Sequence, residues 1–409
     1  MNMNDEKFNL LNDPRVQQSE ITKKFSLRGQ TAPRPVYRIP LDLVYYNNKN
    51  GRIATLISKW EADNGYKIAE LDREKYNETI ENYIIKSNEP AYKKTKKSIE
   101  SISQREAGVV LSNGCIIDGN RRYTCLRRLH SEDGSGKYGY FEAVILDPEI
   151  TAYEKEIKRL ELELQHGQDE KVSYNPIESL IDVYKTVKEE KLLDEKEYAD
   201  NSNKTVSAVK KDLAQAEIII DFLDYINAPG KYYIAVDLQL DASVFEIYNI
   251  KQKLSDEDWE KAKIVLYDNM LVKTIGDIKQ LMRDIKSIVT SEYFDSYFEE
   301  HYEMAKPLHQ KLKETEVLDS DYIKDNIRAD ESLKKNMLAA CENYKYAVAK
   351  TNIKRMPIEQ MEDVYGLLNK IDQDSITHMV GEERQQFINN YNQVKEKINE
   401  IGSKINEVR

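Results

Sequence analysis

The run Asp118-Gly119-Asn120-Arg121-Arg122 carries the clearest chemical signal in the sequence. Arginine presents planar, permanently charged donors that suit phosphate oxygens, and glycine permits a sharp turn and the close approach of a ligand to the backbone. Asp118 adds a carboxylate that could act as a base. Two interpretations stay open: a phosphate-binding turn, or an exposed junction whose arginines pair with nearby acids.

The flanking segments predict how this run is held. Val109–Leu111 and Cys115–Ile117 are short apolar segments on either side of a Gly-containing turn, which is typical of a β-hairpin. Beyond the run, Tyr123, Leu126 and Leu129 recur with helical spacing. The sequence thus predicts a strand, a tight turn and a helix. Unpaired N–H groups at the start of that helix would strengthen the attraction for an anion.

Length and charge limit the classes of protein. A chain of 409 residues with 40% hydrophobic residues is long enough for two or three domains. The net charge of −11 argues against a protein that coats nucleic acid through bulk charge. Residues 1–150 hold 24 Lys and Arg against 21 Asp and Glu, a balance of +3, so the rest of the chain carries −14. Basic residues gather between Lys93 and Arg128, which predicts a local anion-attracting patch on an acidic protein.

Neither a membrane segment nor a zinc site is indicated. No apolar run approaches the roughly 18 residues that span a membrane, and the polar start MNMNDEKFN has no signal-peptide pattern. The three cysteines and five histidines show no metal-type spacing. We expect a cytoplasmic protein with free thiols and no membrane contact.

The order of patterns predicts an α+β fold, in which a small α/β domain precedes a predominantly helical half. Short strands are expected at Val36–Ile39 and Phe141–Leu146. The predicted segments are a flexible arm at 1–33, the α/β domain at 34–150, a helical domain at 151–230, a helical domain of unknown role at 231–380, and a long C-terminal helix at 381–409.

A helix-turn-helix pattern lies within 151–230. A short helix near Glu195–Asp200 and a polar turn precede a longer amphipathic helix. In DNA-binding versions the second helix enters the major groove. The alternative is a plain helical hairpin. The side chains presented to DNA would be Lys204, Thr205, Ser207, Lys210 and Lys211.

The C-terminal segment has a strict heptad pattern. Its apolar residues are spaced 4, 3, 4, 3, 4 and 3 apart, as in a short coiled coil, and run from Phe387 through Tyr391, Val394, Ile398, Ile401 and Ile405 to Val408. Pairing of two copies and packing against the preceding helix of the same chain both fit this pattern.

The order of parts resembles the ParB family of chromosome and plasmid partition proteins over roughly residues 34–226. VYRIPLDLVYYNN…GR is similar to the opening strand and Asn…Arg loop of that family. SIESISQREAGVVLSNGCIIDGNRRYTCLRRL resembles the stretch that ends in the phosphate-binding Gly-Glu-Arg-Arg box. LELQHGQDEKVSYNPIESLIDVY resembles the segment that leads into the helix-turn-helix. The resemblance implies a fold shared with sulfiredoxin.

The resemblance also implies ligands. Gly119, Asn120, Arg121 and Arg122 would hold the phosphates of a nucleoside triphosphate, CTP or ATP, and Arg52 would approach from the facing loop. Glu161 or Glu163 would help to hold Mg²⁺, although by pattern alone these glutamates read as solvated. The implied function is a nucleotide-gated DNA-binding protein that forms a homodimer, bacterial or from a mobile element.

The sequence departs from the partition proteins at the phosphate box. Asn120 replaces the glutamate of the box, and Asp118 precedes the glycine. An Asp-Gly-x-x-Arg box looks more like ParB/sulfiredoxin-fold proteins of DNA modification or phage defence. One alternative is therefore an NTPase, nuclease or small-molecule kinase with Asp118 as catalytic residue. Another is a non-catalytic interaction protein.

Overall fold

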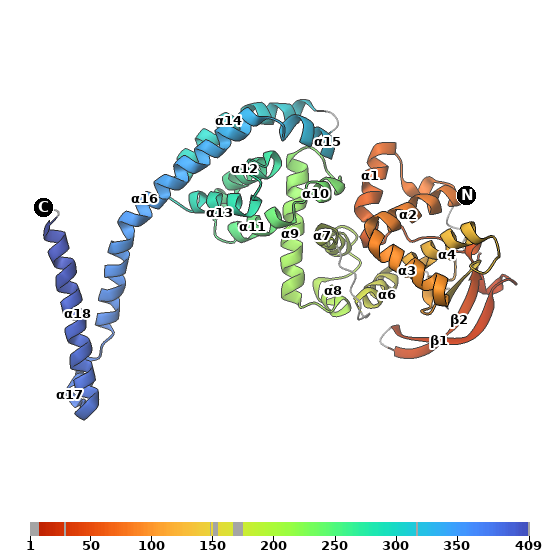
Figure 1. Ribbon diagram of the computed structural model, residues 1–409, viewed down its shortest axis with the longest axis horizontal. Coiled ribbons are helices and arrows are strands. Elements are labelled where there is room, and N and C mark those ends of the chain that lie inside the picture. The colour runs from red at the N-terminus through yellow and green to blue at the C-terminus, as the bar shows by residue number, and fades with distance from the viewer. Residues whose placement is uncertain are drawn as a thin grey trace. The chain divides into compact units, whose positions relative to one another are not determined.

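A computed structural model describes residues 8–27, 30–147, 149, 154–166, 175–315 and 318–407 (Figure 1). The chain divides into two compact units after Asn343. The first unit begins with a five-stranded sheet and continues with helices, so the predicted α+β class is confirmed. The finer division of this unit near residues 150 and 230 stays a prediction.

The sheet is mixed, with strand order β1-β2-β5-β3-β4. Strands β1, β2 and β5 pair antiparallel, β5 pairs parallel with β3, and β3 forms an antiparallel hairpin with β4. The strands predicted from apolar patterns are present as β2, β3, β4 and β5. The bounds are β1 Gln17–Leu27, β2 Gln30–Pro40, β3 Gly108–Leu111, β4 Ile116–Asp118 and β5 Tyr140–Leu146.

The prediction of a flexible arm at 1–33 is wrong for the described part of that segment. Gln17–Leu27 forms β1, an edge strand in register with β2 from Gln17↔Arg38 to Leu27↔Gln30. Most side chains of β1 are exposed, and only Phe25 and Leu27 are buried. The strand is therefore held mainly by backbone pairing, and its sequence carries little of the apolar signal on which strand prediction depends.

Helices cover both faces of the sheet. On one face, Val110 and Ile145 join a core with the helices that precede β5. On the other face, Val109 and Val144 pack against Leu160 of α6. This alternation follows the two-residue period of a strand. The helices of the first face are α1 Ala54–Asn64, α2 Arg73–Ser87, α3 Glu89–Ile102 and α4 Asn120–Asp133.

The rest of the first unit is helical. The region that follows the sheet comprises α6 Glu154–His166, α7 Pro176–Tyr184, a π-helical turn Lys185–Glu189, α8 Glu195–Ser202 and α9 Val206–Tyr225. It continues with α10 Tyr233–Asp237, α11 Asp241–Lys251, α12 Asp256–Val272, α13 Ile278–Val289, α14 Phe294–Glu314, α15 Ser320–Tyr322 and a second π turn Ile323–Ile327. All three cysteines lie in described residues and form no disulfide.

The second unit consists of the end of α16, which runs from Glu331 to Asn369, followed by α17 Gln373–His378 and α18 Gly381–Glu407. The heptad segment is thus helical as far as Glu407, and Val408 lies outside the described residues. Its apolar side chains stay accessible: Tyr391 is 56% exposed and Ile398 is 40% exposed. On α16, Ile358 and Tyr365 are 61% and 69% exposed. Packing within the unit leaves both apolar faces largely uncovered.

Candidate functional site

The turn between β4 and α4 holds the Asp-Gly-Asn-Arg-Arg run. The strand ends at Asp118, Gly119 adopts a left-handed conformation with φ of 101°, and α4 starts at Asn120. A Cβ atom on Gly119 would lie 2.9 Å from Cζ of Phe141 and 3.3 Å from Cα of Gly108. Both the backbone conformation and the packing therefore demand glycine here.

The N-terminus of α4 has no side-chain cap. Its first turn places Arg121 and Arg122 beside backbone N–H groups that lack helical acceptors, at the positive end of the helix dipole. The Oδ1 atom of Asn120 is buried and accepts no hydrogen bond from a described residue. The N–H groups and the positive end of the helix dipole make the turn receptive to an anion, whereas the Oδ1 atom requires a hydrogen-bond donor.

Asp118 anchors the cations of this turn. Its Oδ2 atom accepts hydrogen bonds from Nζ of Lys23 at 2.9 Å and from Nη2 of Arg122 at 3.0 Å. Burial raises the pKa of Asp118, but the charges of Arg122 and Lys23 outweigh it, and the pKa lies below its usual value. The carboxylate is therefore ionised at neutral pH. A carboxylate with a lowered pKa that already accepts from two cations suits positioning better than proton abstraction.

Arg122 is also paired on its other side. Nη1 donates to Oε2 of Glu106 at 3.0 Å, and the side chain of Glu106 is 66% exposed. An exposed pair of this kind contributes little free energy, so a phosphate oxygen could replace Glu106 at modest cost. Arg122 therefore pairs with nearby acids, as one of the two interpretations of the sequence expected. This pairing is compatible with phosphate binding.

The loop that carries Arg52 faces a different cavity. Arg52 belongs to the 3₁₀ turn Gly51–Ile53, and its side chain lies outside the described residues. A cavity of about 430 Å³ is lined by Lys49 and Gly51 of this loop, by Cys115 and Ile117 of the β-hairpin, and by Glu161 of α6. The described lining of this cavity includes none of Asp118–Arg122.

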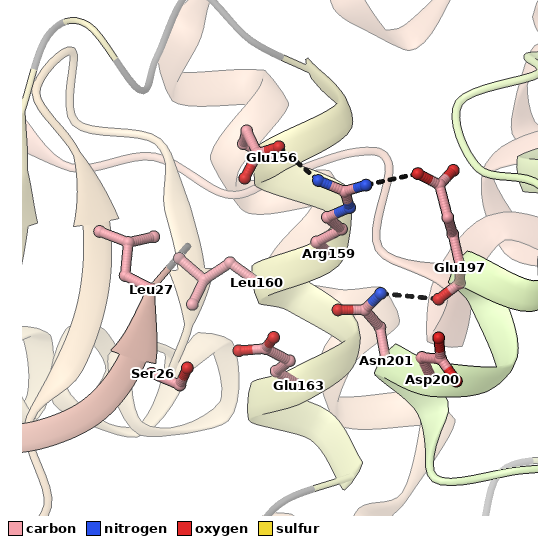
Figure 2. Close-up of a pocket in the computed structure, with 9 residues that line it drawn as sticks. All are labelled: Ser26, Leu27, Glu156, Arg159, Leu160, Glu163, Glu197, Asp200 and Asn201. Carbon is pink, nitrogen blue, oxygen red and sulfur yellow. Dashed lines mark hydrogen bonds and ion pairs between the residues drawn. The ribbon is translucent and has the colours of Figure 1, made fainter. Parts of the chain in front are cut away.

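The two predicted metal ligands point to opposite sides of α6. Residues two apart on a helix differ by about 200° in direction. Glu161 is 3% exposed, lies 3.7 Å from Nζ of Lys158 and lines the 430 Å³ cavity. Glu163 lines a separate pocket of about 240 Å³ (Figure 2). Among the described residues, no three His, Cys, Asp or Glu side chains are grouped to hold a metal ion.

The pocket that contains Glu163 is acidic. Arg159 bridges Glu156 and Glu197, and Nδ2 of Asn201 donates to the carbonyl oxygen of Glu197 at 2.6 Å (Figure 2). Burial, followed by the charge of Glu156, raises the pKa of Glu163. Of these contacts, the one from Arg159 to Glu197 joins α6 to α8, so the pocket lies where these two helices pack together.

Helices α8 and α9 are joined by a short turn. Asn203 closes α8 in a left-handed conformation with φ of 55°, and Thr205 caps α9 by accepting from the N–H of Ala208 at 3.1 Å. Helix α9 packs on both α7 and α8. Thr205 and Ser207 are exposed at the start of α9.

The predicted DNA-contacting lysines have partners within the chain. Nζ of Lys204 donates to Asp212 at 2.8 Å, and Lys210 lies 3.6 Å from Glu195. Lys211 lies 4.7 Å above the ring of Phe245 on α11. Lys210 is the most accessible of the three, with 64% of its side chain exposed.

A second polar cluster was missed from the sequence. Asp268 of α12 is completely buried and contacts Tyr225, His301 and His309. Burial raises the pKa of Asp268, but the hydrogen bonds from the histidines outweigh it and lower the pKa. The sequence signal was an acid inside the apolar run Val265–Val272; the eight-residue spacing of the histidines resembles no metal motif.

No protein-family model matches the chain, and the comparison with curated proteins gives no match either. The resemblance to partition proteins therefore rests on the three motifs in the sequence. Within the described residues, we find no helix that combines the length and apolar character needed to span a bilayer.

Proposed function

We propose that this protein binds a nucleoside triphosphate at the β4–α4 turn and uses it to control binding of DNA through α8 and α9. The observation that carries the proposal is the uncapped N-terminus of α4, entered through left-handed Gly119, with two arginines in its first turn. This arrangement supplies backbone N–H donors, a helix dipole and permanent charges at one place.

Triphosphate oxygens would accept from the N–H groups of the first turn and from Arg121. Arg122 would keep its bond to Asp118 and exchange its exposed partner Glu106 for phosphate. Lys23, which also donates to the carbonyl oxygen of Ala107 at 2.7 Å, would stay fixed as part of the rim. The exchange of Glu106 for phosphate takes place at the exposed edge of the site.

The described carboxylates do not fit a protein-held magnesium site at this turn. Asp118 already accepts from two cations, Glu161 lines another cavity beside Lys158, and Glu163 faces the pocket of Figure 2. A magnesium ion that accompanies the nucleotide would be held by phosphate oxygens and water, which Mg²⁺ commonly keeps.

DNA would meet the exposed start of α9. Thr205 and Ser207 present hydroxyls there, and Lys210 presents the accessible ammonium group. Lys204 and Lys211 are held by Asp212 and Phe245, so they would fix the helix rather than lead the contact. Because only one of the three lysines predicted to contact DNA is freely accessible, on an acidic protein, we expect weak DNA binding without nucleotide.

A second candidate function is hydrolysis or transfer of phosphate, because an ionised carboxylate lies at the anion-receptive turn. Measuring phosphate release from CTP or ATP by the wild type and by Asp118→Asn distinguishes catalysis at Asp118 from the nucleotide-controlled switch. A loss of release in the variant supports catalysis. Unchanged release, or none in either protein, leaves the switch as the better account.

DNA binding is tested by fluorescence anisotropy with a labelled duplex at two salt concentrations, with and without CTP or ATP. We expect nucleotide-dependent binding that weakens with salt. Lys210→Gln should reduce the slope of log affinity against log salt by about 1. Lys324→Gln, another surface lysine beside an acid, serves as the control and should change nothing. Absence of binding with every nucleotide would contradict the DNA-binding part of the proposal.

A further inference from the structure

The missed cluster in the helical part of the first unit has an unusual arrangement. Oδ1 of Asp268 accepts from the hydroxyl of Tyr225 at 2.6 Å. Oδ2 of the same carboxylate lies 3.0 Å from Nε2 of His301 and 2.9 Å from Nε2 of His309. Helices α9, α12 and α14 each contribute to it. A fully buried carboxylate with three hydrogen-bond partners is a strong local negative charge, and most of its acceptor positions are occupied.

The two histidines differ in burial and in their hydrogen-bond partners. His301 is fully buried, and its Nδ1 has no hydrogen-bond partner among the described residues. A proton on Nδ1 would be an unpaired buried donor, so the tautomer that carries its proton on Nε2 fits the contact with Asp268. The side chain of His309 is 17% exposed, and its Nε2 also lies 3.0 Å from the hydroxyl oxygen of Tyr225. His309 is thus the member of the cluster that solvent reaches.

His309 lines a cavity of about 490 Å³, a size that suits a small organic ligand. Its lining combines apolar and aromatic surface with two basic groups: Tyr225, Ile264, Tyr302, His309, Leu312 and Lys313. The side chain of Tyr302 is accessible, and the residue is 42% exposed. Lys313 is exposed, and no described acid forms an ion pair with it. An uncommitted lysine beside a histidine is notable on a chain with net charge −11.

We propose that this cavity binds a small planar aromatic acid, with the ring against Tyr302 and Leu312 and the carboxylate between Lys313 and protonated His309. Asp268 is the positioning residue, because its buried carboxylate holds the imidazole through Nε2 at 2.9 Å. Binding of the anion therefore draws a proton onto His309. This inference is independent of the nucleotide site.

The proton linkage makes the affinity depend on pH. The titratable groups that face His309 are Tyr225 of α9, Asp268 of α12, and Tyr302 and Lys313 of α14, with His301 behind the carboxylate. Among these groups, histidine is the type that ordinarily titrates near pH 6.5. The affinity for an aromatic acid should fall as pH rises from about 6 to about 8.

The test is calorimetric titration of the full chain with indole-3-carboxylate and with indole-3-carboxamide, its uncharged analogue. The acid should bind at least about tenfold more tightly than the amide at pH 6, and it should take up a proton at pH 8. Lys313→Met should remove the preference for the acid. Lys306→Met on the same helix, a lysine paired with Glu303, should keep it. His309→Gln should abolish the proton uptake, with melting curves to show that the variant is folded.

Three results would overturn the proposal: equal affinity for acid and amide, an acid preference that survives Lys313→Met, or no binding of either compound at about 1 mM. Each of these results would leave the Asp268 cluster with only a structural role in the helical core.

Discussion

At the scale of single residues, Asp118 is the centre of the candidate site. Its carboxylate accepts from Lys23 on the edge strand and from Arg122 on α4, and thereby connects two elements that lie far apart in the sequence. The side chains of Lys23, Asp118 and Arg122 are 17–20% exposed, so solvent screens their ion pairs only in part. Asp118 thus has a structural role whether or not a nucleotide is bound.

This role predicts a pH-dependent stability difference. Asp118→Asn should lower the free energy of unfolding by about 2 kcal/mol at pH 7, because two charge-assisted hydrogen bonds weaken. The folded-state pKa of Asp118 lies below its usual value of 3.8, so its contribution is complete above that value and is lost as the pH falls through the folded-state pKa. Urea unfolding at pH 7 and near pH 3 measures this. If the wild type and Asp118→Asn differ in free energy of unfolding by the same amount at both pH values, this role of Asp118 is contradicted.

Gly119 gives a second prediction at this scale. Gly119→Ala should cost about 2 to 3 kcal/mol, because a left-handed backbone and a Cβ at 2.9 Å from Phe141 are both unfavourable. Gly134→Ala is the matched control: Gly134 has φ of 59°, and no atom lies within 4 Å of the position that a Cβ would take, so only the conformational cost of about 1 kcal/mol remains. Equal destabilisation of the two variants would rule out the packing argument.

At the scale of elements, two apolar runs on either side of a Gly-containing turn predicted the β3–β4 hairpin, and apolar residues at helical spacing predicted α4 and α9. Strand β1 escaped prediction because pairing with β2, rather than buried side chains, holds it. The positions of Glu161 and Glu163 follow from helix geometry once α6 is known to pack on the sheet through Leu160 and Leu164. The Asp268 cluster depends on tertiary packing of three helices, which no local pattern encodes.

The helix-turn-helix can be tested as an element through its cap. Thr205→Ala should lower the free energy of unfolding by about 1 kcal/mol, because the N–H of Ala208 loses its acceptor at the start of α9. Ser207→Ala, an exposed position in the first turn with no hydrogen bond from its side chain to a described residue, should change it by less than about 0.5 kcal/mol. Urea unfolding measures both, and similar values for both variants would contradict the cap.

At the scale of the whole molecule, the second unit is the part that packing within the chain leaves incomplete. The apolar residues of α18 follow a heptad pattern, and many of them stay accessible, as do those on the end of α16. Exposed apolar surface of this extent usually marks a contact with another protein. We propose pairing with a second copy through α18, in line with the spacing of its heptads.

Homodimer formation predicts twice the chain mass of 47.7 kDa in light scattering. Ile398→Glu, which places a charge in the middle of the heptad face, should shift the mass toward that of a single chain. Lys397→Glu, the neighbouring residue with a 72% exposed side chain, is the control and should have less effect. A wild-type protein that stays monomeric at all concentrations would contradict the pairing.

The central claim is that the turn from Asp118 to Arg122 receives the phosphates of a nucleotide, and a thermal-shift titration tests it most directly. CTP, ATP and GTP are added to the wild type, to Arg121→Ala and to the control Arg283→Ala, each with and without Mg²⁺; Arg283 lies on α13 and its side chain is 60% exposed. The account predicts that at least one triphosphate raises the melting temperature of the wild type and of Arg283→Ala, while Arg121→Ala shows no shift. No shift with any triphosphate, or an equal shift in Arg121→Ala, would contradict it.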